Sequence, residues 1–245
     1  MTKTAPQATA HKASTSANLD VVCIASWNAD LVSRVARPIA RGETLMAHSF
    51  EIQPGGKGSN AAVAAARQGA KVGVIARIGD DDFGRMALAL WAREGIDTQH
   101  VEVAANERSG VAQILVFDDG DNCIAVATGA GAGLGETNVA VASQAIRSAK
   151  VVMASNEVPM AATLAAFKIA RAAGVTTILN PAPAMELPDE LIALCDVLTP
   201  NESEAHTLWG RGAAAMIVTM GGEGCAIYQN DQLIKTVAGW SVQVV

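Results

Sequence analysis

The sequence predicts an α/β protein with a doubly wound, mostly parallel β-sheet and a small antiparallel β appendage. Hydrophobic residues make up 50% of the 245 residues and aromatic residues only 4%, so the apolar content is mainly Ala, Val, Ile and Leu. This composition suits buried parallel strands covered by Ala-rich helices, because small side chains let helix and sheet pack closely. From residue 136 onward, helical patterns alternate with short apolar runs, as they do in βαβ units. Short exposed segments with turn signals in the first half predict the antiparallel part.

The elements of the expected sheet follow from local patterns. Residues 19–25 form a short, apolar, β-branched run that is typical of a buried strand. A glycine-rich turn at 55–60 leads into a helix at 61–68, which Gly69 ends. The other expected strands are 72–78, 151–154, 175–179, 196–198, 216–220 and 225–228, and the other helices are 83–94, 137–149, 159–173 and 201–209.

The antiparallel part is expected between these units. Residues 111–117 and 123–127 are apolar runs on either side of the turn sequence at 118–122, which predicts a β-hairpin. Short mixed segments between residues 31 and 52, interrupted by Pro38 and Gly42, indicate exposed strands.

Chain organisation and charge exclude several classes of protein. Residues 1–18 are rich in Ala, Thr and Ser without an apolar signal segment, so we expect a disordered tail before one α/β domain at 19–245. No apolar stretch reaches the roughly 20 residues that cross a bilayer, so no membrane partner is expected. A net charge of −6 without a basic block disfavours nucleic acid as a partner.

The cysteines point to a reducing compartment. Cys23, Cys123, Cys195 and Cys225 are far apart and have no C-x-x-C spacing. Each lies in or beside an apolar run, so we expect reduced thiols packed as small hydrophobic side chains, not disulfides or a zinc site. A cytoplasmic protein is the expectation.

Unusual loops gather at one edge of the expected sheet. In doubly wound sheets, ligands bind in the crevice beyond the carboxyl ends of the strands. The loops that fall at that edge are 26–30, 55–60, 155–157, 180–184, 199–204 and 219–224. Because these six loops fall at the same edge of the sheet, we expect one binding region there.

The loop at 55–60 is not a Walker A loop, which requires G-x-x-x-x-G-K-[ST]. Its paired glycines, Gly55 and Gly56, let the backbone approach a ligand, since no Cβ intervenes. Asn60 offers a donor and an acceptor, which matches a sugar hydroxyl. The alternative is a tight turn in which Asn60 caps the helix.

Acidic and amide side chains follow two other strands. Asn28 and Asp30 come after the first strand, and a carboxylate there can accept hydrogen bonds from two neighbouring hydroxyls. The alternative is a turn-forming Asx pair. Glu157 precedes a helix and is either a ligand residue or a cap that complements the helix dipole.

Two further loops suit a nucleotide. Asn201 and Glu204 open a helix, either as a capping box or as a Mg²⁺ site near phosphates, since Mg²⁺ prefers oxygen ligands. Thr219 and Gly221 follow another strand, where a glycine turn can bind phosphates through backbone N–H groups or simply join two strands. The glycines at 129–135 fail the G-x-G-x-x-G register, which argues against a nicotinamide-dependent oxidoreductase.

Five motifs occur in a characteristic order. They are Ser26-x-Asn28-x-Asp30, Gly55-Gly56-Lys57-Gly58-x-Asn60, Gly79-Asp80-Asp81-x-x-Gly84, Asn180-Pro181-Ala182-Pro183-Ala184 and Thr199-Pro200-Asn201-Glu202-x-Glu204. In these motifs the chain resembles the ribokinase (PfkB-type) carbohydrate kinase family, from Leu19 almost to its C-terminus. The resemblance implies an ATP-dependent phosphotransferase that converts a small sugar, above all D-ribose, to its 5-phosphate.

The resemblance also implies roles for individual residues. Asn28, Asp30, Gly56, Lys57, Asn60 and Glu157 would bind the sugar. Asn201 and Glu204 would lie beside Mg²⁺ and phosphate, and Thr219 and Gly221 beside the nucleotide. ATP and Mg²⁺ are the implied cofactors, together with a monovalent cation. Segments 31–52 and 98–126 would form a β lid that closes over the sugar and builds a homodimer.

The chain departs from the family pattern at two places. Family members continue, soon after the position of Val245, with a glycine-rich segment that carries the catalytic Asp. No catalytic base is therefore assigned within the chain, which is expected to be inactive alone. A helix usual in the family is also missing between Trp209 and Ala215. The alternatives are a non-catalytic sugar-binding fragment and a kinase for another furanose or a nucleoside.

Overall fold

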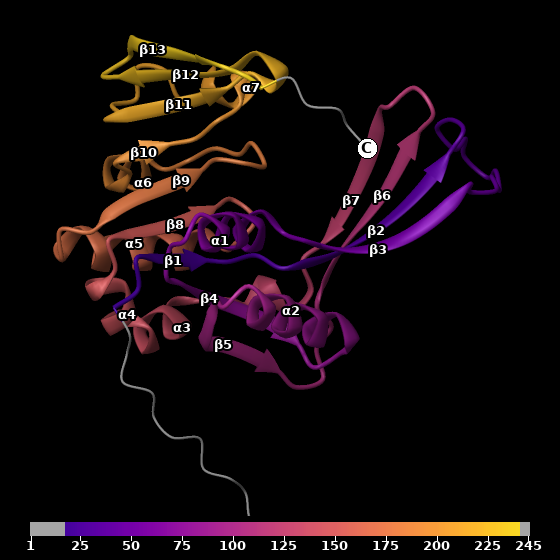
Figure 1. Ribbon diagram of the computed structural model, residues 1–245, viewed down its shortest axis with the longest axis horizontal. Coiled ribbons are helices and arrows are strands. Elements are labelled where there is room, and N and C mark those ends of the chain that lie inside the picture. The colour runs from indigo at the N-terminus through magenta and orange to yellow at the C-terminus, as the bar shows by residue number, and fades with distance from the viewer. Residues whose placement is uncertain (1–17, 241–245) are drawn as a thin grey trace, which may run out of the picture.

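Two β-sheets and the helices around the larger one make up the molecule (Figure 1). The computed structural model describes residues 18–240. The predicted tail at 1–18 lies outside the described residues except for Asn18, which is exposed.

The large sheet has nine strands in the order β13-β12-β11-β10-β9-β8-β1-β4-β5. From β5 to β11 every neighbouring pair is parallel, and β12 and β13 are added antiparallel. The strands are β1 (Val21–Ile24), β4 (Val72–Gly79), β5 (Asp97–Ala104), β8 (Val151–Ser155), β9 (Thr176–Asn180), β10 (Val197–Leu198), β11 (Ala215–Thr219), β12 (Gly224–Gln229) and β13 (Gln232–Ala238). The predicted mostly parallel, doubly wound sheet is thus confirmed.

Helices cover both faces of this sheet, because the central strands are apolar on both sides. In β1, Val22 and Ile24 belong to the core with Phe167, whereas Val21 and Cys23 belong to the core with Trp91 on the other face. The helices are α1 (Lys57–Arg67), α2 (Asp82–Arg93), α3 (Glu136–Val141), α4 (Ser143–Ser148), α5 (Met160–Ala172), α6 (Asp189–Leu194) and α7 (Glu202–Ala205). Burial on both faces explains why β1 reads as a continuous apolar run.

The small sheet projects from the large one, at the right of Figure 1. Its four strands are ordered β3-β2-β6-β7, and they are β2 (Asn28–Val35), β3 (Ser49–Gly55), β6 (Gly110–Phe117) and β7 (Asn122–Ala127). The pairs β2–β3 and β6–β7 are antiparallel, as predicted for hairpins, but the central pair β2–β6 is parallel. Only residues 25–27 separate β1 from β2, so the chain passes directly from one sheet into the other.

The structure corrects the sequence-based assignment at the outer edge of the large sheet. Residues 98–104 were expected in the lid, but β5 pairs in parallel with β4 and forms the edge of the large sheet. Strand β5 lies at the edge of the sheet and mixes exposed with half-buried residues before the buried Ala104, which resembles the mixed pattern of the small sheet.

Three helical segments also differ from expectation. The helix expected at 137–149 is two short helices, which meet at the buried residue Ala142. The helix expected at 201–209 is shortened to α7, and turns continue to Gly210, which has a φ of +73°. The helix expected at 61–68 begins four residues earlier, at Lys57. Helix α6 and strand β13 were not predicted.

Helix α1 begins early because its first turn lies directly on the end of β1. Gly56 has a φ of +91°, and a Cβ there would lie 2.7 Å from the Ser26 carbonyl oxygen. A Cβ on Gly58 would lie 2.6 Å from the Ala25 Cα. Only glycine allows this approach, so the glycine-rich loop is a packing contact as well as a turn.

The cysteines form no disulfide among the described residues, which include all four of them. Cys23 and Cys195 are buried, and burial raises the pKa of each thiol to about 12. Cys123 is exposed on the small sheet, so the expectation of a packed thiol is wrong there. Within residues 18–240, no helix has the length and apolar character needed to cross a membrane.

The contact between α1 and β1 predicts that Gly58→Ala destabilises the protein. The new methyl group meets backbone atoms that cannot move aside, so we expect the free energy of unfolding to fall by roughly 1–3 kcal/mol. The gain in helix propensity, about 1 kcal/mol, offsets only part of this. Urea unfolding measures the change.

Gly222→Ala is the matched control for Gly58→Ala. A Cβ on Gly222 meets nothing within 4 Å, so its effect should stay within about 0.5 kcal/mol. Equal stability of the two variants would contradict a close contact at Gly58.

Candidate functional site

One cavity collects all six residues that were predicted to bind a sugar. It has a volume of about 170 Å³ and lies where the end of β1, the start of α1, the loop after β8 and the small sheet meet. Its lining residues are Asn28, Asp30, Gly56, Lys57, Asn60, Ala112, Ile114, Ile124, Val126 and Glu157. The expected convergence of loops at one sheet edge is therefore present for these residues.

The carboxylate of Glu157 holds three segments of the chain together. Its Oε2 accepts hydrogen bonds from the Ser26 hydroxyl (2.8 Å) and the Lys57 backbone N–H (2.7 Å). The Ser26 Oγ in turn accepts from the Gly58 N–H (3.0 Å). Oε1 of Glu157 accepts no hydrogen bond from the described residues, so it remains free to accept one from a ligand.

The alternative that Glu157 caps a helix is right about the role but wrong about which helix. Glu157 does lie at a helix N-terminus, but the helix is α1 and not α5, which begins at Met160 with no side-chain cap. The contact joins residues 100 positions apart in the sequence. The Lys57 N–H donates to the carboxylate at the positive end of the α1 dipole, a position where a negative charge is stabilising.

Asn28 and Asp30 are strand residues, not an Asx turn. They are the first and third residues of β2, so both side chains lie on the same face of the small sheet. Asn28 is buried and Asp30 is half-buried. A Cβ on Gly55 would overlap the Asp30 carboxylate, so glycine at position 55 makes room for it.

Two carboxylates share this cavity, and their proximity affects ionisation. Burial, followed by the negative charge of Glu157, raises the pKa of Asp30 above its ordinary value. Both effects oppose the ionised form, because the charge leaves water and meets a like charge. The site therefore keeps a destabilised carboxylate that hydroxyl donors of a ligand can stabilise.

Lys57 and Asn60 reach the cavity from the first turn of α1. They are three residues apart and therefore lie on the same side of the helix. Asn60 donates its backbone N–H to the Gly56 carbonyl (2.8 Å), so it is an interior residue of the turn. The prediction that Asn60 caps the helix is wrong, since Gly56 occupies that position.

The apolar side of the cavity was not predicted from the sequence. Four residues of the small sheet supply it: Ala112, Ile114, Ile124 and Val126. Their positions follow from strand register, since Asp30 pairs with Ala112, which pairs with Val126. Alternation along β6 and β7 could have identified them if the pairing of β2 with β6 had been known.

The residues predicted to bind the nucleotide form a separate group at the same sheet edge. Asn201 forms an isolated parallel bridge with Thr219, and Gly221 follows in a turn with a φ of +54°. None of the four lines the cavity described above. The ends of β8 and β11 are three strand positions apart, which corresponds to about 14 Å.

The structural alternatives for these four residues are also present. Asn201 Oδ1 accepts from the Glu204 N–H (2.8 Å) and Glu204 Oε2 accepts from the Asn201 N–H (2.9 Å), which is a capping box. The turn at Gly221 joins the antiparallel strands β11 and β12. Residues 18–240 contain no cluster of three or more His, Cys, Asp or Glu side chains suited to a metal ion.

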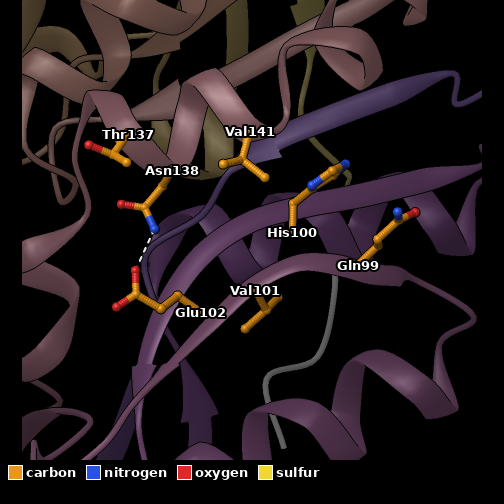
Figure 2. A pocket seen from close by; sticks show the side chains of 7 residues that line it. All are labelled: Gln99, His100, Val101, Glu102, Thr137, Asn138 and Val141. Atoms are coloured by element: carbon orange, nitrogen blue, oxygen red, sulfur yellow. Dashed lines mark hydrogen bonds between the residues drawn. The ribbon is translucent and has the colours of Figure 1, made fainter. Parts of the chain in front are cut away.

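Another hollow lies away from the candidate site, between β5 and α3 (Figure 2). His100 and Glu102 of β5 line it together with Thr137 and Asn138 of α3. The Asn138 amide donates to the Glu102 carboxylate (2.6 Å), which ties the helix to the edge strand. None of the predicted site residues lines this hollow.

The fold and the cavity define an α/β protein that binds a small polar ligand. Comparison with known proteins agrees with this class. The model of the pfkB family carbohydrate kinases matches residues 18–245. The ribokinase of Haemophilus influenzae is 36% identical over 240 residues, which cover 91% of this chain and 78% of that protein. The chain belongs to the pfkB family of carbohydrate kinases.

Two more similarities support this assignment. The ribokinase of Staphylococcus aureus is 42% identical over 193 residues, covering 78% of this chain and 63% of that protein, which is less than two thirds of its length. The solved structure of ribokinase from Giardia lamblia is 25% identical with a TM-score of 0.83, and the match covers 93% of this chain and 77% of that one.

The raised pKa predicts that Asp30→Asn stabilises the protein at neutral pH. The folded-state pKa exceeds the unfolded value, so the ionised form of Asp30 opposes folding at pH values above both. We expect a larger free energy of unfolding for the variant at pH 7, and the difference should vanish as the pH falls toward the ordinary value of 3.8.

Urea unfolding at several pH values measures this difference. Glu51→Gln is the control, because Glu51 is an exposed carboxylate of the same small sheet. A variant Asp30→Asn that is less stable than the original protein at pH 7 would show that the carboxylate has a stabilising partner.

Proposed function

We propose that the cavity binds a furanose sugar, most of all D-ribose, for transfer of the γ-phosphoryl group of ATP to its primary hydroxyl, a reaction that also requires a general base in addition to the residues assigned to the sugar. The observation that carries the proposal is the division of the cavity into a polar and an apolar side. A furanose has the same two characters, since its hydroxyl groups lie at the edge of a ring whose faces carry C–H groups. Similarity to ribokinases supports ribose as the sugar.

The polar residues then have distinct roles in sugar binding. Asp30 accepts hydrogen bonds from two neighbouring hydroxyls, and their donation favours its ionised form. Asn28 and Asn60 each donate and accept through their amides. Glu157 uses its free Oε1, Gly56 lets the backbone approach closely, and Lys57 supplies a cation beside the ring.

The second group of residues would bind ATP with Mg²⁺. Asn201, Thr219 and Gly221 lie beside the phosphates, which backbone N–H groups of a glycine turn suit. Glu204 offers one carboxylate, and its Oε2 is already occupied by the Asn201 N–H. One carboxylate fits Mg²⁺, which usually keeps several waters and takes other ligands from phosphates. Bound Mg²⁺ would neutralise charge on the transferring group.

The small sheet would act as a lid over the sugar. Closure excludes water from the reacting phosphoryl group and prevents wasteful hydrolysis of ATP. On the face opposite Asp30 the sheet also exposes large apolar side chains, including Phe50 and Ile52. We propose that this surface pairs two copies of the chain as a homodimer. We also propose that a monovalent cation assists catalysis and that the protein acts in the cytoplasm.

Other substrates remain within the same proposal. Deoxyribokinase of Salmonella typhi is 31% identical over 239 residues, so a furanose other than ribose is a second candidate substrate for the same cavity. The named relatives are kinases, which gives no support to the alternative of a non-catalytic sugar-binding fragment.

Isothermal titration should show that the 245-residue protein binds D-ribose. Asp30→Ala should weaken binding by about 100-fold or more, since hydrogen bonds to a charged group contribute roughly 1.5–3 kcal/mol each. Glu51→Gln on the exposed part of the same sheet should bind like the original protein. No binding of ribose, together with strong binding of a nucleoside or a fructose phosphate, would overturn the substrate class.

A coupled assay of ADP release separates binding from catalysis. The proposal assigns both carboxylates of the cavity, Asp30 and Glu157, to the sugar and leaves no general base among the described residues around it. We therefore expect the 245-residue chain to bind ribose without releasing ADP above background. Robust turnover that Asp30→Asn or Glu157→Gln abolishes even at saturating ribose would identify that carboxylate as the base.

A further inference from the structure

Asp81 is a buried carboxylate that the proposed sugar and nucleotide sites do not use. Its residue is 8% exposed, at the end of β4 and directly before α2. Its Oδ1 accepts the Gly84 backbone N–H (2.8 Å), which makes Asp81 the N-cap of α2. A neutral side chain would serve as a cap equally well, so the cap alone does not account for a buried charge.

The remaining hydrogen bonds of Asp81 go to Ser109, 28 positions further along the chain. Asp81 Oδ2 accepts the Ser109 backbone N–H (2.9 Å), and Oδ1 accepts the Ser109 hydroxyl (2.7 Å). Ser109 is 3% exposed, and its Oγ accepts the Gly79 N–H (3.0 Å). Burial acts to raise the pKa of Asp81, but these hydrogen bonds outweigh it and the pKa lies below its ordinary value.

Ser109 lies where the chain enters the small sheet. The next residue, Gly110, begins β6 and pairs with Asn28, and a Cβ on Gly110 would collide with the Asn28 amide oxygen. The chain leaves the small sheet at the same place, because the Ala130 N–H donates to the Arg108 carbonyl (2.7 Å). Entry and exit are thus both fixed beside Asp81.

The register of β6 connects this junction to the candidate sugar site. From Gly110 onward, Ala112 pairs with Asp30, and Ala112 and Ile114 line the cavity. Because β6 is paired with β2 along its whole length, a shift of Ser109 would move Asp30, Ala112 and Ile114 together, relative to Asn60 and Glu157 on the large-sheet side of the cavity.

We propose that Asp81 is a positioning residue for sugar binding, which acts through Ser109 and Gly110 to fix the small sheet over the sugar. The inference rests on the proposed function, since it assumes that the cavity binds a furanose. Asp81 touches no ligand in this proposal. It contributes by holding the residues of the small sheet, Asp30, Ala112 and Ile114, at the correct distance from Asn60 and Glu157 on the other side of the cavity.

Asp81→Asn separates this role from helix capping. Asn is as good an N-cap as Asp, so α2 keeps its first hydrogen bond. The new NH₂ group cannot accept the Ser109 N–H, which leaves a buried donor without a partner. We expect D-ribose to bind about tenfold more weakly by isothermal titration, whereas ATP binds unchanged, since none of the proposed nucleotide residues contacts this junction.

A hydrogen-exchange measurement and a control variant complete the test. Hydrogen exchange of the backbone amides of β6 should become faster in Asp81→Asn, whereas the amides of α2 should keep their protection. Asp82→Asn is the matched control, because the neighbouring side chain is 92% exposed and, in the part of the chain that the structure describes, pairs only with Arg85. It should leave both ribose binding and exchange unchanged.

The outcomes distinguish this inference from the proposed function. If the original protein binds no furanose, the proposed function fails. If it binds ribose and Asp81→Asn binds equally well, the positioning role is refuted, whatever the variant's melting temperature. Should Asp81→Asn fail to fold, Ser109→Ala decides: it keeps the backbone hydrogen bond, and a several-fold loss of ribose affinity supports the role, whereas unchanged affinity overturns it.

Discussion

The candidate site depends on the contact of Glu157 with the residue that follows the loop start after β1, Ser26, and with the first residue of α1, Lys57. One carboxylate oxygen accepts from Ser26 after β1 and from Lys57 at the start of α1. The backbone must be close enough for these bonds, and Gly56 and Gly58 allow it because they carry no Cβ against residues 25 and 26. The arrangement of polar groups around Glu157 therefore depends on close backbone contacts, which a larger residue at position 56 or 58 would separate.

The same arrangement places two carboxylates in one cavity, which stability alone would not favour. Glu157 has its charge compensated by the α1 N-terminus. Within residues 18–240 Asp30 lacks such a partner, and both burial and Glu157 raise its pKa. A site that binds hydroxyl groups needs acceptors whose hydrogen bonds are not already satisfied within the protein. The destabilised Asp30 and the free oxygen of Glu157 meet that need, as functional residues often do at the expense of stability.

Local patterns in the sequence were sufficient for the buried strands but not for contacts between distant segments. Strands β1 and β4 were predicted to within two residues, because strands buried on both faces read as apolar runs. Strand β5 was assigned to the wrong sheet, because an edge strand and a strand of the small sheet have the same mixed pattern. Asn60 was placed at the helix start because the Gly56 contact with Ser26, which moves that start, joins residues far apart in the sequence. The apolar side of the cavity was missed for the same reason.

The two sheets are joined by short crossings, and this makes the cavity sensitive to their relative position. The first crossing is residues 25–27, between β1 and β2. A second crossing is Gly56, between β3 and α1. The other two meet near Ser109 and Ala130, where Arg77 donates to the carboxylates of Glu102 and Glu107 and to the Ala130 carbonyl. Lys57, Asn60 and Glu157 belong to segments on the large-sheet side, whereas Asn28, Asp30 and the apolar lining residues belong to the small sheet. A ligand that contacts both groups is therefore bound only when these crossings hold the sheets in register. Affinity for the ligand and the position of the small sheet are therefore coupled by the construction of the fold.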